Sequence, residues 1–144
     1  MSFYVPLLLP AGGNSGSQSS SLIIRGLATG PIHAADWWRV FRRELAQGIS
    51  LGVTLAFFGF LRARVSGDGG RFALLVSVTV IGLVILGCVV GAMLPLLLHR
   101  LGLDPATTST PFIATLIDAL GIVLYLSLAR YILADLLPPE PRAG

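Results

Sequence analysis

The sequence predicts an all-α, polytopic bundle of about four transmembrane helices. Hydrophobic residues make up 54% of the 144 residues and charged residues only 12%, far from the balance of soluble globular proteins. Long apolar runs follow one another along the chain, as a multi-pass protein requires. We therefore expect one membrane domain over 1–137 and a disordered, proline-rich tail over 138–144.

Three apolar runs are long enough, or nearly so, to cross a bilayer as helices. They are Leu45–Leu61, Phe72–Leu98 and Phe112–Ala134. The middle run carries no charge and is long enough to cross with tilt. Gly48 and Gly52 stand four residues apart, as do Gly87 and Gly91. This spacing either marks close helix contacts or is an ordinary feature of membrane helices.

A fourth candidate span, Phe3–Ile24, is apolar at both ends and rich in Gly and Ser between them. One interpretation is a flexible linker, since this composition leaves little to bury. In a helix, the segment would carry a polar stripe beside a row of small residues. The stripe comprises Asn14, Gln18, Ser21 and Arg25, and the small residues are Gly12, Gly16 and Ser20. Such a stripe must face protein or water inside a bilayer.

The segment Arg25–Glu44 has the composition of an amphipathic interfacial helix, and a plain loop is an equal alternative for its first ten residues. Asp36 is placed to cap a helix, and tryptophans and arginines alternate after it. We expect the helix to follow the membrane surface and to turn inward near Leu45. Five arginines fall in segments on one side of the membrane and five on the other, so the count alone does not set the orientation. Those of the short first loop favour a cytoplasmic Arg25–Glu44.

Several classes of function have little support in the sequence. The net charge of +3 comes from ten arginines spread over loops, so nucleic acid is not an expected partner. His33 and His99 are expected in loops, and Cys88 stands alone in an apolar run, which gives no transition-metal cluster. No nucleophile and base are paired, so we expect no enzyme.

Asp118 is an acid about two helical turns into the last predicted span. A carboxylate near the middle of a bilayer costs roughly 2.5–3.5 kcal/mol on insertion scales, so it needs a partner, water or a cation. Its neighbours on the same face include Ala114, Thr115 and Gly121, which suit a wet passage. A polar helix contact or an arginine ion pair is the alternative. A hard cation such as Mg²⁺ fits a carboxylate with retained waters, and Asn14, Gln18 and Thr115 are expected to hydrogen-bond those waters.

The sequence also resembles a known family, the membrane domain of the MgtE-type magnesium transporters. The resemblance covers most of the chain, from Val5-Pro6 to about Ala134, and rests on several motifs in a fixed order. These are Gly12-Gly13-Asn14-Ser15-Gly16-Ser17-Gln18, Leu22–Ala28, Val90–Pro95, Leu101–Ala106 and Pro111–Asp118.

The resemblance implies a homodimer in the cell inner membrane with a Mg²⁺ pore between the protomers. Asp118 matches the family's pore acid, Ala114 matches a small residue that lines the ion site, and Asn14 matches an asparagine on the helix that starts this chain. Thr110 stands where the family commonly has asparagine, which keeps an oxygen and loses the amide. Thr115, Gly121, Gln18 and Thr110 are expected to line the pore.

Family members usually carry a cytoplasmic N-terminal domain, paired CBS domains and five membrane helices, whereas this chain starts within the second helix. One expectation is therefore a shortened chain whose missing helix comes from another chain. The alternative to transport is a truncated, non-transporting membrane interaction subunit or fragment. Family topology places Arg25–Glu44 and His99–Thr110 in the cytoplasm.

Overall fold

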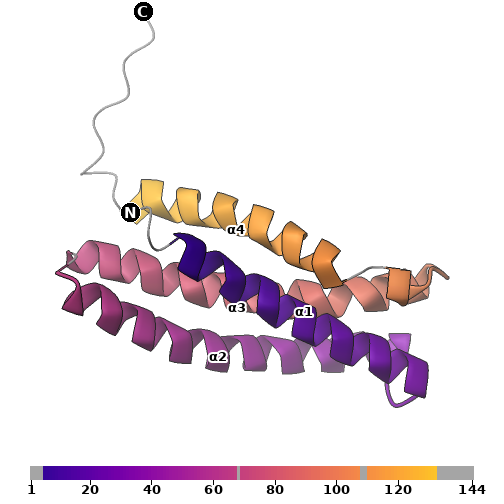
Figure 1. Cartoon of the computed structure of the whole chain (residues 1–144). Helices are drawn as coiled ribbons and strands as arrows, with labels where there is room; N and C mark the ends of the chain where they lie inside the picture. The colour runs from indigo at the N-terminus through magenta and orange to yellow at the C-terminus, as the bar shows by residue number, and fades with distance from the viewer. Residues whose placement is uncertain (1–4, 68, 108–109, 133–144) are drawn as a thin grey trace, which may run out of the picture.

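The computed structural model describes residues 5–67, 69–107 and 110–132, and this part of the chain is built from helices (Figure 1). The long helices are α1 (Val5–Thr29), α2 (Trp37–Val65), α3 (Gly70–Arg100) and α4 (Thr110–Ile132). Two short 3-10 turns, η1 (Ala34–Asp36) and η2 (Pro105–Thr107), lie in the connections. The predicted tail over 138–144 falls outside the described residues.

Within the described residues, three helical segments are long and apolar enough to cross a membrane. They are Ala34–Val65, Gly70–Arg100 and Phe112–Ile132, and they contain the three predicted runs apart from two residues at the end of the last. The predicted all-α membrane bundle is thus confirmed, and the chain is a multi-pass membrane protein. The α1 helix is the fourth long helix, although its Gly/Ser stretch makes it less apolar than the others.

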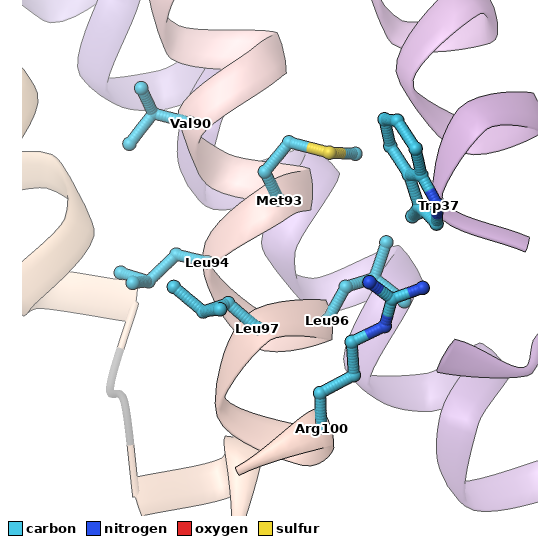
Figure 2. A pocket seen from close by; sticks show the side chains of 7 residues that line it. All are labelled: Trp37, Val90, Met93, Leu94, Leu96, Leu97 and Arg100. Carbon is cyan, nitrogen blue, oxygen red and sulfur yellow. The ribbon is translucent and has the colours of Figure 1, made fainter. Parts of the chain in front are cut away.

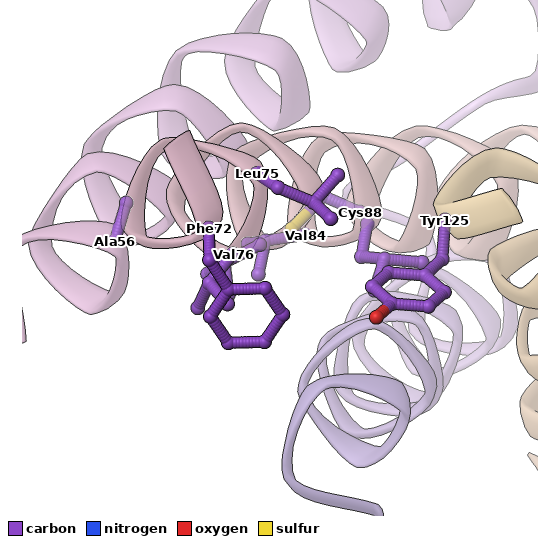
Figure 3. Close-up of a cluster of buried hydrophobic side chains, with 9 residues drawn as sticks. Ala56, Phe72, Leu75, Val76, Val84, Cys88 and Tyr125 are labelled. Carbon is purple, nitrogen blue, oxygen red and sulfur yellow. The ribbon is translucent and has the colours of Figure 1, made fainter. Parts of the chain in front are cut away.

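The α3 helix lies at the centre of the bundle and packs against the other three (Figure 1). Its buried side chains, including Leu75, Leu83 and Val84, form the main apolar core together with Ala56 of α2 and Tyr125 of α4 (Figure 3). A helix that is apolar all round is expected at such a central position. The core explains why Phe72–Leu98 carries no charge.

Both glycine pairs mark contacts within the chain. A Cβ atom added to Gly48 or Gly52 would lie about 3 Å from Ile85 or Ile81 of α3, so α2 packs closely there. Gly87 and Gly91 are covered by the backbone carbonyls of Gly12 and Gly16 of α1. Such contacts are possible only where side chains are absent.

The start of α2 differs from its prediction. One helix runs from Trp37 to Val65 without the expected turn near Leu45, so Trp37–Glu44 forms the first turns of a spanning helix. His33 lies in the connection before it, where its N–H donates a 2.9 Å hydrogen bond to Asp36. His99 was expected in a loop but lies in the last turn of α3.

Candidate functional site

The polar stripe of α1 lies on the outside of the bundle. Asn14, Gln18, Ser21 and Arg25 are all exposed, whereas Gly12, Gly16 and Ser20 are buried. The linker interpretation is therefore wrong, and the helical interpretation is confirmed. Because α1 packs with its small residues inward, the amide groups of Asn14 and Gln18 face away from the protein core.

Asp118 lies on α4 where this helix meets α1. A Cβ atom at Gly13 would be 3.0 Å from the Asp118 Oδ1 atom and 3.6 Å from the Ala114 Cβ atom, so the carboxylate rests against bare α1 backbone. Oδ1 is buried and has no hydrogen-bond partner among the described residues. A buried carboxylate oxygen without a donor is costly, which makes this oxygen a place where a water or a cation would be stabilised.

The structure brings some of the predicted site residues together. Ala114 lies one turn before Asp118, and Asn14 follows Gly13, which contacts both. Gln18 and Thr115 are exposed. Gly121, which was also expected to line the pore, is buried within one copy of the chain, and its role in the pore stays a prediction. The side chain of Thr110 lies outside the described residues.

An arginine was the alternative partner for Asp118, but no described arginine forms an ion pair with it. The two ion pairs found there join His33 to Asp36 and Arg43 to Glu44. The described part of the chain also gathers no group of three His, Cys, Asp or Glu side chains that could hold a metal ion. A cation at Asp118 would therefore need waters, backbone oxygens or a second copy of the chain to complete its oxygen ligands.

Glu44 is a buried acid that the sequence analysis assigned to the membrane surface. Its side chain is 1% exposed, its Oε2 accepts a 2.6 Å hydrogen bond from Ser19 of α1, and its Oε1 lies 3.2 Å from Arg43. The contact fixes α1 against α2 one residue after Gln18. The signal in the sequence was helical spacing, since Glu44, Gly48 and Gly52 lie on one face and all three are buried.

Comparison with known proteins supports a family assignment. The family model MgtE, described as a divalent cation transporter, matches residues 5–128. The chain is 49% identical over 134 residues to the magnesium transporter MgtE of Thermus thermophilus and 28% identical over 129 residues to that of Bacillus subtilis. These matches cover 92% and 90% of this chain but 29% of each relative, so the chain spans less than a third of their length. With the helical bundle and the matched motifs, they show that the chain belongs to the MgtE family.

Proposed function

We propose that this chain forms the membrane part of a Mg²⁺ transporter, with the ion passing between two copies of the chain beside Asp118. The observation that carries the proposal is the buried Oδ1 of Asp118, which has no partner among the described residues. Mg²⁺ is bound through one or two carboxylates and usually keeps several waters. One Asp118 from each of two protomers would supply that number of carboxylates.

The outward polar stripe of α1 supports a path between protomers. Asn14 and Gln18 are exposed on a helix that packs against the apolar helices α3 and α4. Amide groups facing hydrocarbon without partners cost several kcal/mol each. A two-fold symmetric dimer would place the same stripe from both copies around one wet passage. Asn14, Gln18 and Thr115 would then hydrogen-bond the waters of the ion, and the Ala114 position would leave room for it.

The test of the ion site is Mg²⁺ flux into vesicles that contain the purified chain. We expect Asp118→Ala and Asp118→Asn to abolish most of the flux, because neither keeps the carboxylate. Asp36→Asn is the matched control, since it removes an acid that lies in the connection before α2 and pairs with His33. If Asp118→Ala carried as much Mg²⁺ as the unchanged chain, the ion site would be disproved.

The dimer is tested by cross-linking across the proposed two-fold axis. In a Cys88→Ala background, Gln18→Cys is expected to form an intermolecular disulfide in the membrane. Phe57→Cys is the control, because this residue is 64% exposed on α2, away from the α1 stripe. Cross-linking through position 57 but not 18 would place the dimer contact elsewhere and contradict the proposed path.

The second candidate, a non-transporting interaction subunit, loses part of its support. It rested partly on small-residue faces available to a partner, but Gly48 and Gly52 contact α3, and Gly87 and Gly91 contact α1. The vesicle assay separates the candidates, since a passive subunit carries no flux until a partner chain is added. We also propose that the protein resides in the cell inner membrane with the connection between α1 and α2 in the cytoplasm. Arginines flank this connection at the end of α1 and the start of α2, which favours that side.

A further inference from the structure

A basic cavity lies where the end of α1 meets the start of α2. It has a volume of about 440 Å³, and its lining includes Arg25, Arg39 and Arg43. Leu22, one turn before Arg25, lines the same cavity and is 41% exposed. The cavity therefore joins cationic groups to an apolar edge on the membrane-spanning part of α1.

The three arginines of this cavity differ in whether a carboxylate pairs with them. Arg43 pairs with the buried Glu44, and the one acid of the lining, Asp36, is engaged by His33. Arg25 and Arg39 form no side-chain hydrogen bond or ion pair with the residues that the structure describes. Two guanidinium groups thus line the cavity with no carboxylate paired to either of them. A guanidinium favours phosphate because its N–H groups form paired bonds.

The depth of the cavity in the membrane follows from its neighbours. Trp37 and Trp38 begin α2 and are 45% and 54% exposed. Tryptophans collect at the level of the lipid headgroups, where their rings are half in hydrocarbon and half in water. Arg39 follows directly after them in the same helix. The free arginines therefore lie at the depth of lipid phosphates, which are abundant there.

We propose that this basic cavity binds the phosphate of an anionic phospholipid, with Arg25 and Arg39 as its ligands and an acyl chain along Leu22. Basic pockets at the ends of membrane helices are known to bind acidic headgroups. The lipid would bridge the end of α1, which carries the polar stripe, to the start of α2. The site shares Arg25 with the end of the polar stripe, and its lining does not include Asp118.

A second cavity is a weaker candidate for a phosphate site than the basic cavity. It measures about 370 Å³ and lies between the start of α2 and the end of α3, lined by Trp37, Met93, Leu97, Arg100 and neighbouring apolar residues (Figure 2). Arg100 is its one charged group, and the Nε of Arg100 already donates a 2.9 Å hydrogen bond to the Ala34 carbonyl. One guanidinium that is partly engaged gives a weaker phosphate site than two free ones.

The test is native mass spectrometry of the purified chain in detergent at about 0.15 M salt, titrated with dioctanoyl phosphatidylglycerol or dioctanoyl phosphatidylcholine. We expect the anionic lipid to bind at least about tenfold more tightly than the zwitterionic one, and Arg25→Gln/Arg39→Gln to remove most of that preference. Arg43 is kept, because its loss would leave Glu44 unpaired.

The control is Arg62→Gln/Arg64→Gln, which removes the same charge from the other end of α2. We expect it to change the preference less than about twofold. The proposal is overturned if the first double variant keeps the preference, or if both double variants lose it equally. It is also overturned if inorganic phosphate or a hexaglutamate peptide displaces the lipid at equal concentration, since the site would then be one for soluble anions or acidic proteins.

Discussion

Gly13 of α1 and Asp118 of α4 face each other across the helix contact, and a Cβ atom at Gly13 would lie 3.0 Å from the Asp118 Oδ1. This separation is tighter than nine in ten real Cβ contacts. The missing side chain at Gly13 therefore sets how closely the carboxylate can lie against α1. The position of the carboxylate is set by packing against α1, since the described residues offer Oδ1 no hydrogen bond.

We therefore expect Gly13→Ala to lower Mg²⁺ flux while leaving the fold intact. The added methyl group would push the carboxylate aside by a few tenths of an ångström or into another rotamer, and a flexible side chain can make that move at small cost. Flux into vesicles and thermal unfolding in detergent measure the two effects separately. Gly59→Ala is the control, because its Cβ would meet Val76 at an ordinary 3.4 Å. Undiminished flux in Gly13→Ala would contradict a role for this contact.

The close approach between the backbones of α1 and α3 gives a prediction about stability. A Cβ atom at Gly91 would overlap the backbone of Gly16, which cannot move without shifting α1. We expect Gly91→Ala to lower the free energy of unfolding by about 1–3 kcal/mol, the usual cost of overpacking. Reversible unfolding in mixed micelles measures it.

Gly82→Ala is the control for that variant. Its Cβ would meet the end of the Leu124 side chain at 2.9 Å, and a leucine can change rotamer. The control is therefore expected to unfold nearly as the unchanged chain does. Equal losses in Gly82→Ala and Gly91→Ala would show that helix crowding in general, and not the contact between α1 and α3, causes the effect.

The sequence predicts some elements better than others for physical reasons. Phe72–Leu98 is long and carries no charge, so its place in a spanning helix, α3, follows from composition alone. The α1 helix is different, since its Gly/Ser composition suits a linker equally well. It becomes a helix in the bundle because Gly12 and Gly16 fit against Gly87 and Gly91. That contact joins distant parts of the chain, and no local pattern decides it.

Likewise, some residues of the candidate site could be predicted from the sequence and others could not. The cost of an acid in a bilayer was enough to select Asp118. The burial of Glu44 was missed because tryptophans and arginines before it indicated a surface segment. Glu44 instead lies on the buried face of α2 and accepts a hydrogen bond from Ser19 of α1. Whether Gly121 lines the pore depends on how two copies of the chain pack, which no pattern in one sequence decides, so that expectation stays a prediction.

Glu44 gives a prediction that separates its packing from its charge. Glu44→Ala would remove the acceptor for both Ser19 and Arg43 and leave a hole at a position that is 1% exposed. We expect it to lower the free energy of unfolding by about 3–5 kcal/mol, as is usual when one partner of a buried pair is removed. Glu44→Gln keeps the volume and an oxygen that can accept the Ser19 hydrogen bond, so its loss is expected to be smaller.

The same variants test whether Glu44 fixes the rotation of α1. Ser19 follows Gln18, so losing the 2.6 Å hydrogen bond frees α1 to turn and to carry its polar stripe away from the proposed two-fold axis. In the Cys88→Ala background, Glu44→Ala is expected to lower the yield of the cross-link through Gln18→Cys, and Glu44→Gln to preserve most of it. Asp36→Ala is the control, since its pair with His33 is largely exposed. A full cross-link yield in Glu44→Ala would show that the glycine contacts alone orient α1.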